Sequence, residues 1–216
     1  MRLENENFTV ETDSESGYIT QITVPNDIYG MNFVLDGRQF GRINWKAKHY
    51  SEPFAPVSVN TVSKDGSTVS RYSNGRCEAM LKIDFSESGE LRMRYVFQNV
   101  SPVPLCLCRD TVGIEIPFND RYTHAEECLT RRCHTHIHCG LTSSWVNALR
   151  MGPSEINLGL ALTEGSLVSY SQYECKTNER GYFELEPETV ILNKGESYTV
   201  AWETFVHSGW DDFSVA

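Results

Sequence analysis

Three histidines at alternating positions, His134, His136 and His138, have the clearest capacity for chemistry in this chain. Alternate side chains of an extended strand point to the same face, so the three imidazoles would form a row. Such a row can hydrogen-bond a polyhydroxylated ligand, bind a metal ion or titrate near neutral pH. An ordinary polar sheet face, hydrogen-bonded to its neighbours and to water, has the same composition.

Trp145 and Asn147 follow the histidines closely and would share one face of a strand. The flat face of an indole complements the C–H face of a pyranose ring. The same ring also suits plain core packing. We therefore take five residues as a candidate carbohydrate-binding or interdomain surface: His134, His136, His138, Trp145 and Asn147.

A metal site is an alternative use of the histidine row. Alternate residues of a strand lie ~7 Å apart, and zinc needs nitrogen ligands at about 2.0–2.1 Å, so two imidazoles can converge if another strand adds a Glu or Cys. Cys133 and Cys139 would point to the opposite face, and the spacing matches no standard zinc motif. We assign no metal and no cofactor to the chain, and keep a metal-binding module as an alternative.

The composition restricts the partners. The chain has 216 residues and a formal net charge of -10, which argues against nucleic acid or an anionic membrane. The first residues lack the apolar core of a signal peptide, and no run approaches the ~18 apolar residues of a membrane span. Seven cysteines without a CxxC pair indicate reduced thiols, and we expect a cytoplasmic location.

Apolar and polar residues alternate along most of the chain, which is typical of half-buried strands. Residues 77–85 and 91–97 form a predicted hairpin around a Ser/Gly turn. Residues 144–151 fit a short helix or a strand, and for residues 145–151 we favour a strand paired with residues 158–163. Further strands are expected at residues 8–11, 18–24, 32–35, 42–46, 57–62, 69–72, 105–109, 112–117, 133–139, 167–173, 182–185, 190–192 and 198–207.

No segment has a sustained helical stripe, and no Pro-, Gly- or Ser-rich linker divides the chain. Many strands without helices predict two large antiparallel sheets packed face to face. We therefore expect an all-β fold, a large antiparallel β-sandwich, formed by a single domain over residues 1–216.

Three stretches carry a resemblance to a known family. Residues 13–22 match D-x-x-x-G-x-I-x-x-I, residues 91–105 contain a strand ending in N-x-S, and residues 185–202 match L-x-P…L-x-x-G-E-S-x-x-V-x-W. Together they resemble the galactose-mutarotase-like β-supersandwich. The chain is most similar to the N-terminal domain that precedes an α/α-barrel catalytic domain in glycoside-hydrolase-like proteins.

The resemblance implies a carbohydrate-associated module without activity of its own. Such a module would pack on a following catalytic domain and contact a sugar, so the expected partners are carbohydrate or that domain. The sequence ends at Ala216, soon after the last expected strand, and no helical toroid follows. We expect either that the catalytic part lies outside this chain or that the domain stands alone.

A stand-alone aldose-1-epimerase (mutarotase) is the alternative that the resemblance offers. The similar enzymes use a His and a Glu as acid and base near the anomeric centre. None of the local sequences matches the mutarotase catalytic motifs, so no catalytic residue is assigned. The candidate donors are His134, His136, His138 and His207, and the candidate acceptors are Glu126, Glu164, Glu174 and Glu203.

Overall fold

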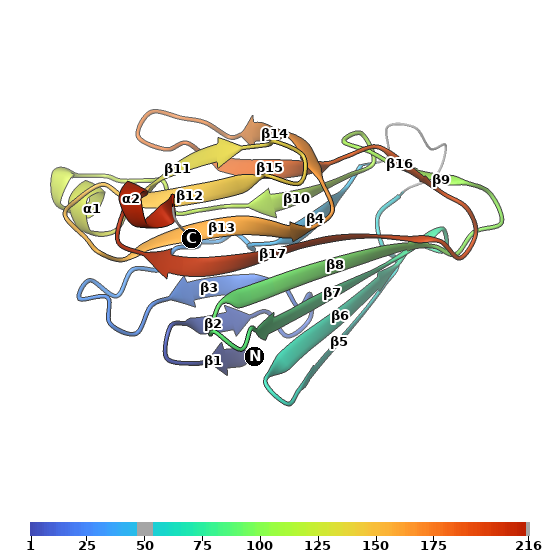
Figure 1. Cartoon of the computed structure of the whole chain (residues 1–216), viewed down its shortest axis with the longest axis horizontal. Helices are drawn as coiled ribbons and strands as arrows, with labels where there is room; N and C mark the ends of the chain where they lie inside the picture. The colour runs from blue at the N-terminus through green and yellow to red at the C-terminus, as the bar shows by residue number, and fades with distance from the viewer. Residues whose placement is uncertain (47–53, 215–216) are drawn as a thin grey trace.

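The computed structural model describes residues 1–46 and 54–214, and it confirms the all-β prediction. Two layers of antiparallel strands pack face to face (Figure 1). The described residues add two short helices, α1 (Ala125–Thr130) and α2 (Trp210–Phe213). Neither helix is long and apolar enough to cross a membrane.

One layer is an eight-stranded sheet. Its order is β11 (Cys133–His138), β12 (Trp145–Arg150), β13 (Asn157–Glu164), β17 (Ser197–His207), β8 (Leu91–Asn99), β7 (Cys77–Phe85), β6 (Ser67–Ser73) and β5 (Ser58–Lys64). The predicted hairpin is confirmed, since Cys77 pairs with Asn99 and Phe85 with Leu91. The strand preferred for residues 145–151 is also confirmed, and β12 pairs with β13 as expected.

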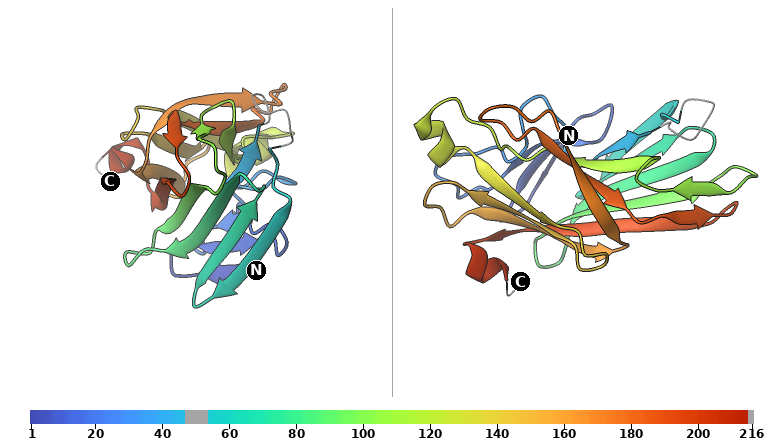
Figure 2. Two further views of the ribbon diagram at one scale, coloured as in Figure 1. Left: turned by 90° about the vertical axis from the view of Figure 1, so that its right-hand side faces the viewer. Right: turned by 90° about the horizontal axis from the view of Figure 1, so that it is seen from above.

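Smaller sheets form the second layer, on the far side of the core (Figures 1 and 2). The four-stranded sheet has the order β14 (Leu167–Tyr173), β15 (Tyr182–Pro187), β10 (Val112–Ile116) and β4 (Arg42–Trp45). The three-stranded sheet has the order β1 (Arg2–Glu4), β2 (Thr9–Thr12) and β3 (Ile19–Thr23). A separate pair joins β16 (Val190–Leu192) to β9 (Leu105–Leu107).

Aromatic rings join the two layers across the core. Tyr18, just before β3, stacks on Tyr72 of β6 with ring centroids 5.1 Å apart. Trp45 of β4 meets Phe97 of β8 edge to face at 6.4 Å. Such pairs add to the free energy of area burial, because ring quadrupoles favour these geometries. The core therefore fixes the two sheets in one relative position.

At Gly41 the two layers lie close to each other. The Tyr95 hydroxyl donates a 2.8 Å hydrogen bond to the Gly41 carbonyl from the opposite sheet. Gly41 has φ +78°, and a Cβ there would lie 2.5 Å from the Tyr95 hydroxyl oxygen. Glycine satisfies both demands because it lacks a Cβ and adopts positive φ freely.

The expected strand at residues 32–35 is wrong in its extent. The described structure has one isolated bridge there, between Val34 and Phe118. The Asn32 side-chain oxygen accepts hydrogen bonds from the backbone N–H groups of Ile22 and Val34. The Asn32 side chain thus replaces backbone hydrogen bonds that a neighbouring strand would supply. Asn side chains commonly compete with regular structure in this way.

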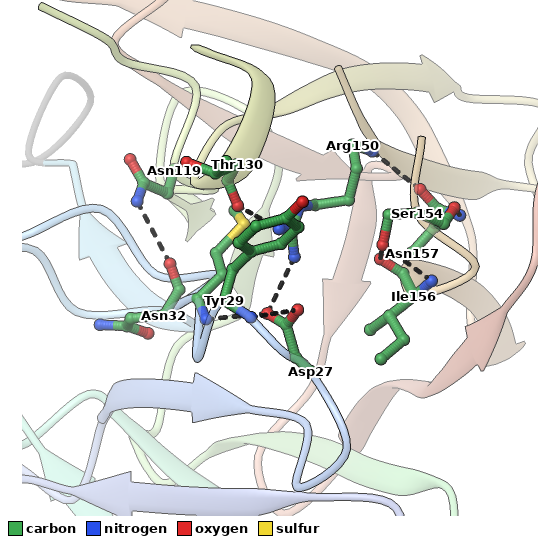
Figure 3. A network of polar contacts seen from close by, with 10 residues as sticks. Asp27, Tyr29, Asn32, Asn119, Thr130, Arg150, Ser154, Ile156 and Asn157 are labelled. Atoms are coloured by element: carbon green, nitrogen blue, oxygen red, sulfur yellow. Dashed lines mark hydrogen bonds and ion pairs between the residues drawn. The ribbon is translucent and has the colours of Figure 1, made fainter. Parts of the chain in front are cut away.

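A buried ion pair fixes the end of the sandwich near α1 (Figure 3). Arg150, whose side chain has no exposed surface, lies 2.9 Å from the carboxylate of Asp27. The same guanidinium donates to the Thr130 carbonyl at the end of α1. It also lies over the ring of Tyr29, 5.5 Å from the centroid. Two segments distant in sequence, residues 27–29 and the end of α1, are therefore tied to one side chain.

Candidate functional site

The histidine row lies on one face of β11, as the alternation predicts. Cys133 and Thr135 point into the core and are buried, whereas His134 and His136 are half-buried and His138 is exposed. The rings of His134 and His136 contact each other, with centroids 4.9 Å apart. The row therefore occupies the outer face of the eight-stranded sheet, away from the core.

Trp145 and Asn147 lie beside the histidines on this outer face. His138 pairs with Trp145, and His136 pairs with Asn147, so the side chains of each pair project from the same side. The rings of His138 and Trp145 stack with centroids 5.6 Å apart. The structure thus brings the five candidate residues of the sequence analysis onto one surface.

Phe205 of β17 completes this surface on the other side of Asn147. Gly159 of β13 pairs with both Asn147 and Phe205, and the Phe205 ring lies over it. A Cβ at Gly159 would lie 2.5 Å from a ring carbon of Phe205, so glycine makes room for the ring. We call the surface formed by His136, His138, Trp145, Asn147 and Phe205 the aromatic face.

Helix α2 covers the aromatic face and was not expected from the sequence. It stands outside the eight-stranded sheet, next to β13 and β17 (Figure 2, right). The Trp210 ring lies 5.2 Å from His136 and 6.0 Å from Trp145. The Phe213 ring lies 5.3 Å from Trp145 and 5.8 Å from Phe205.

Asn147 is the buried polar group beneath these rings. The residue has no exposed surface. Within the described residues, neither its Oδ1 nor its Nδ2 has a hydrogen-bond partner. An unpaired buried amide is destabilising, and such groups are rare in folded proteins. Asn147 therefore needs an explanation that packing alone does not supply.

Asp120 is a functional candidate that the sequence analysis missed. Its side chain is 1% exposed and accepts a 2.6 Å hydrogen bond from Arg132 Nε. Its second oxygen lies 3.7 Å from both His134 Nδ1 and an Arg180 nitrogen. Nothing in the sequence marks it, because it lies 14 residues before the row in an irregular segment.

Burial lowers the pKa of His134 and of His136 below the ordinary value of a histidine. For His134 the carboxylate of Asp120 opposes this shift and Arg180 adds to it. For His136 the cation of Arg180 adds to it as well. Both rings are therefore neutral at pH 7, and each can donate one hydrogen bond and accept another.

The structure gives little support to the His/Glu pairs suggested for a mutarotase. Glu164 pairs with Arg94, Glu174 pairs with Arg38, and Glu126 lies exposed on α1. Glu203 lies on the outer face opposite Arg92. The carboxylate that acts on His134 and His136 is that of Asp120. His207 is buried, and its Nδ1 lies 2.9 Å from the Gly209 carbonyl.

Metal binding gains no support from the arrangement. In residues 1–46 and 54–214, no group of three or more His, Cys, Asp or Glu side chains is placed to hold a metal ion. Cys133 points into the core, opposite to the row, and its thiol donates to the Asn119 carbonyl. Burial raises the pKa of that thiol far above its ordinary range.

Three carboxylates, Glu115, Glu184 and Glu186, form a second polar surface that the sequence analysis also missed. They lie on the outer face of the four-stranded sheet, and their side chains are 5%, 0% and 6% exposed. Lys46 forms an ion pair with Glu184, and Asn44 donates a 2.6 Å hydrogen bond to it. We call Glu115, Glu184, Glu186 and Lys46 the carboxylate face.

Glu115 differs from its two neighbours because its positive partner is distant. Arg42 approaches it only to 3.8 Å, whereas Glu184 lies directly opposite in register. Burial raises the pKa of Glu115 above the ordinary value, with Glu184 adding to the shift against Arg42. The carboxyl group lines a pocket of about 380 Å³ with Arg38 and Arg42. A carboxyl group with a raised pKa can act as a general acid or base.

Comparison with known proteins finds similar structures. No protein-family model and no curated protein sequence matches the chain. A polysaccharide lyase of solved structure is 31% identical, with a TM-score of 0.79 over 98% of this chain and 34% of the lyase. A putative aldose 1-epimerase from Escherichia coli K12 is 10% identical, with a TM-score of 0.64 over 96% of this chain and 98% of that one. A heparinase III is 8% identical, with a TM-score of 0.53 over 98% and 34%.

The chain therefore spans about a third of the length of the lyase and of the heparinase. It spans nearly the whole of the epimerase-like protein. The epimerase-like protein and the heparinase are 8–10% identical to this chain, so these two similarities concern the fold alone.

Proposed function

The chain has the galactose-mutarotase-like β-sandwich fold, which occurs in carbohydrate-active proteins, and from this premise we propose that it is the non-catalytic module of a larger polysaccharide-degrading protein. The module packs against a catalytic domain and contacts the polysaccharide. The contact surface is the candidate surface of His134, His136, His138, Trp145 and Asn147. As in the related glycoside-hydrolase-like architecture, the module would lie N-terminal to the catalytic domain.

One observation carries this proposal: the match to the lyase covers 98% of this chain but 34% of the lyase, at 31% identity. Two thirds of the lyase have no counterpart here, so a catalytic site in that part would be absent from this chain. The aromatic face adds chemical support. Aromatic rings stack on the C–H faces of pyranoses, and neutral imidazoles hydrogen-bond hydroxyl groups.

The test separates binding from catalysis in the 216-residue chain. Alginate, hyaluronan and cellulose-derived tetrasaccharides are titrated calorimetrically, and cleavage of the uronate polymers is followed by the ultraviolet absorbance of the unsaturated product. We expect binding without cleavage. We also expect Trp145→Ala to weaken binding at least about tenfold, since a stacked ring contributes on the order of 1.4 kcal/mol.

Tyr170→Ala is the matched control, because Tyr170 is 45% exposed on β14, away from the aromatic face. Cleavage of a uronate polymer by the chain alone would contradict a non-catalytic role. Equal loss of binding in both variants would contradict the assignment to the aromatic face.

A stand-alone aldose epimerase is the second candidate, favoured by the raised pKa of Glu115 in its pocket. The acid–base group would then be Glu115 of the carboxylate face. Polarimetry of freshly dissolved glucose and galactose tests this, with Glu115→Gln as the comparison. Mutarotation at the buffer rate with the native chain would exclude this candidate for both sugars.

A further inference from the structure

We propose that α2 is a displaceable cap on a saccharide site, and that a pyranose ring replaces Trp210 and Phe213 on the aromatic face and hydrogen-bonds the amide of Asn147. This inference rests on the proposed function, because it uses the same surface for sugar contact. It goes further by assigning an occupant to the uncovered site and a regulatory role to the C-terminal helix.

Asn147 is the first feature that points to a ligand. The residue is fully buried at the centre of the outer face, between His136 and Gly159 in register. Both of its amide atoms lack partners in the described residues. An amide offers two donor hydrogens and an acceptor, which is the complement of adjacent sugar hydroxyls. A hydroxylated ligand would satisfy the group, whereas the rings of α2 cannot.

The attachment of α2 to the sheet is the second feature. The helix has four residues, and its N-cap, Gly209, makes no side-chain capping hydrogen bond. In the described residues the backbone hydrogen bonds of α2 are local, from the Phe213 N–H to the Gly209 carbonyl and from the Ser214 N–H to the Trp210 carbonyl. Asp212 accepts from Ser208, which is also local. Ring contacts are therefore the main attachment of α2 to the sheet.

The connection at Gly209 and the exposure of Trp210 are the third feature. Gly209 joins β17 to α2 with φ +155°, in the region that favours glycine. The Trp210 ring already lies partly in solvent, and the residue is 45% exposed. Rotation about Gly209 would move Trp210 and Phe213 together and leave β17 in place. A helix of four residues has little intrinsic stability, so its position depends on the surface beneath it.

The surface that remains after α2 moves away is the fourth feature. Trp145 and Phe205 would present two aromatic surfaces on either side of Asn147, with His136 beside them. Trp210 and Phe213 now fill the place where a flat, partly apolar ring would stack. A pyranose has apolar faces and polar edges, so it can contact the rings and Asn147 together.

The experiment measures binding of the same tetrasaccharides to three full-length variants. Trp210→Ala combined with Phe213→Ala removes the cap, and we expect affinity to rise about tenfold if the native cap is closed nine-tenths of the time. Asn147→Leu keeps the volume but removes the amide, and we expect binding to fall at least about tenfold. Tyr170→Ala is the control and should leave the affinity unchanged.

Hydrogen–deuterium exchange of the native chain supplies an independent readout. The amides of Phe213 and Ser214 are hydrogen-bonded in α2, so displacement by a saccharide should speed their exchange. Slower exchange on binding would overturn the cap, because the helix would then be part of the bound state.

The outcomes distinguish this inference from the proposed function. If the native chain binds at Trp145 but the cap variant binds equally or more weakly, the cap is wrong and the sugar-contacting module stands. If neither protein binds any of the tetrasaccharides, the saccharide site and its cap are both wrong. If Asn147→Leu binds as tightly as the native chain, the amide is not the anchor.

Discussion

The two outer faces of the sandwich differ in how their buried polar groups are partnered. On the carboxylate face the buried acids lie beside cations: Glu184 has both Lys46 and Asn44 as partners, and Glu115 has Arg42 at 3.8 Å. On the aromatic face the buried amide of Asn147 has none in the described residues, and rings cover it. Charged groups are costly to bury alone, so the acids of the carboxylate face need cations beside them. An amide is less costly to leave unpaired, so the aromatic face tolerates Asn147 without a partner in the described residues.

The largest predicted effect comes from removing one partner on the carboxylate face. Lys46→Met leaves Glu184 buried without its cation, and we expect the free energy of unfolding to fall by about 3–5 kcal/mol. Urea denaturation measures this. The control is Lys82→Met, whose side chain is 42% exposed and pairs with Asp84, where we expect a loss of about 1 kcal/mol or less. Equal losses would show that the carboxylate face is solvated in solution.

The faces should also respond to pH with opposite signs, and Glu115 gives the first test. Its raised pKa means that the folded state binds more protons than the unfolded state around and above pH 4.5. Ionisation of Glu115 therefore costs stability at pH 7, and protonation relieves that cost as the pH falls. We expect Glu115→Gln to raise the free energy of unfolding at pH 7 by on the order of 1 kcal/mol. A gain that persists undiminished at pH 4 would contradict this.

His207, which lies beside Phe205 and Phe213, gives the reverse sign. Burial lowers its pKa, so between the folded and unfolded pKa values the unfolded state binds more protons. Stability is then complete above about pH 6.5 and is lost as the pH falls through the window below it. His207→Gln should flatten this part of the stability curve. Thermal denaturation at pH 7.5, 6.5 and 5.5 measures it, and an unchanged slope would show that other groups cause the loss.

Asn147→Leu should have the smallest effect on stability. No hydrogen bond is lost in the described structure, and an unpaired amide is replaced by an apolar group of similar volume. We expect a change between zero and a gain of about 1 kcal/mol, measured by urea denaturation. A large loss would mean that Asn147 has structural partners in solution, and the two faces would then be alike.

The sequence predicts most of the fold because alternation is a local property. The turn at Ser86–Glu90 and the alternation on either side of it locate β7 and β8 correctly. The expected pairing with residues 158–163 favours a strand over a helix at Trp145–Arg150, and the structure confirms the strand. Helix α2 escapes detection because four residues are too few to show a helical period, and its stability comes from rings on other strands.

The sites are harder to predict, because partners come from distant segments. Glu184 and Glu186 alternate with Leu185, a pattern typical of a solvated face. They are buried because Lys46 and Asn44 approach from a strand about 140 residues earlier, and because Gly113 leaves room for Glu184. The histidine row is visible in the sequence, but Asp120 becomes its neighbour only in the fold.

Gly41 should resist substitution among homologous chains. Any other residue there would need a positive φ and would collide with Tyr95 from the opposite sheet. The histidines lie on the outer face and do not set the distance between the layers, whereas Gly41 does. Among distant homologues, a glycine facing a tyrosine at this crossing should therefore outlast the histidines as an evolutionary signature.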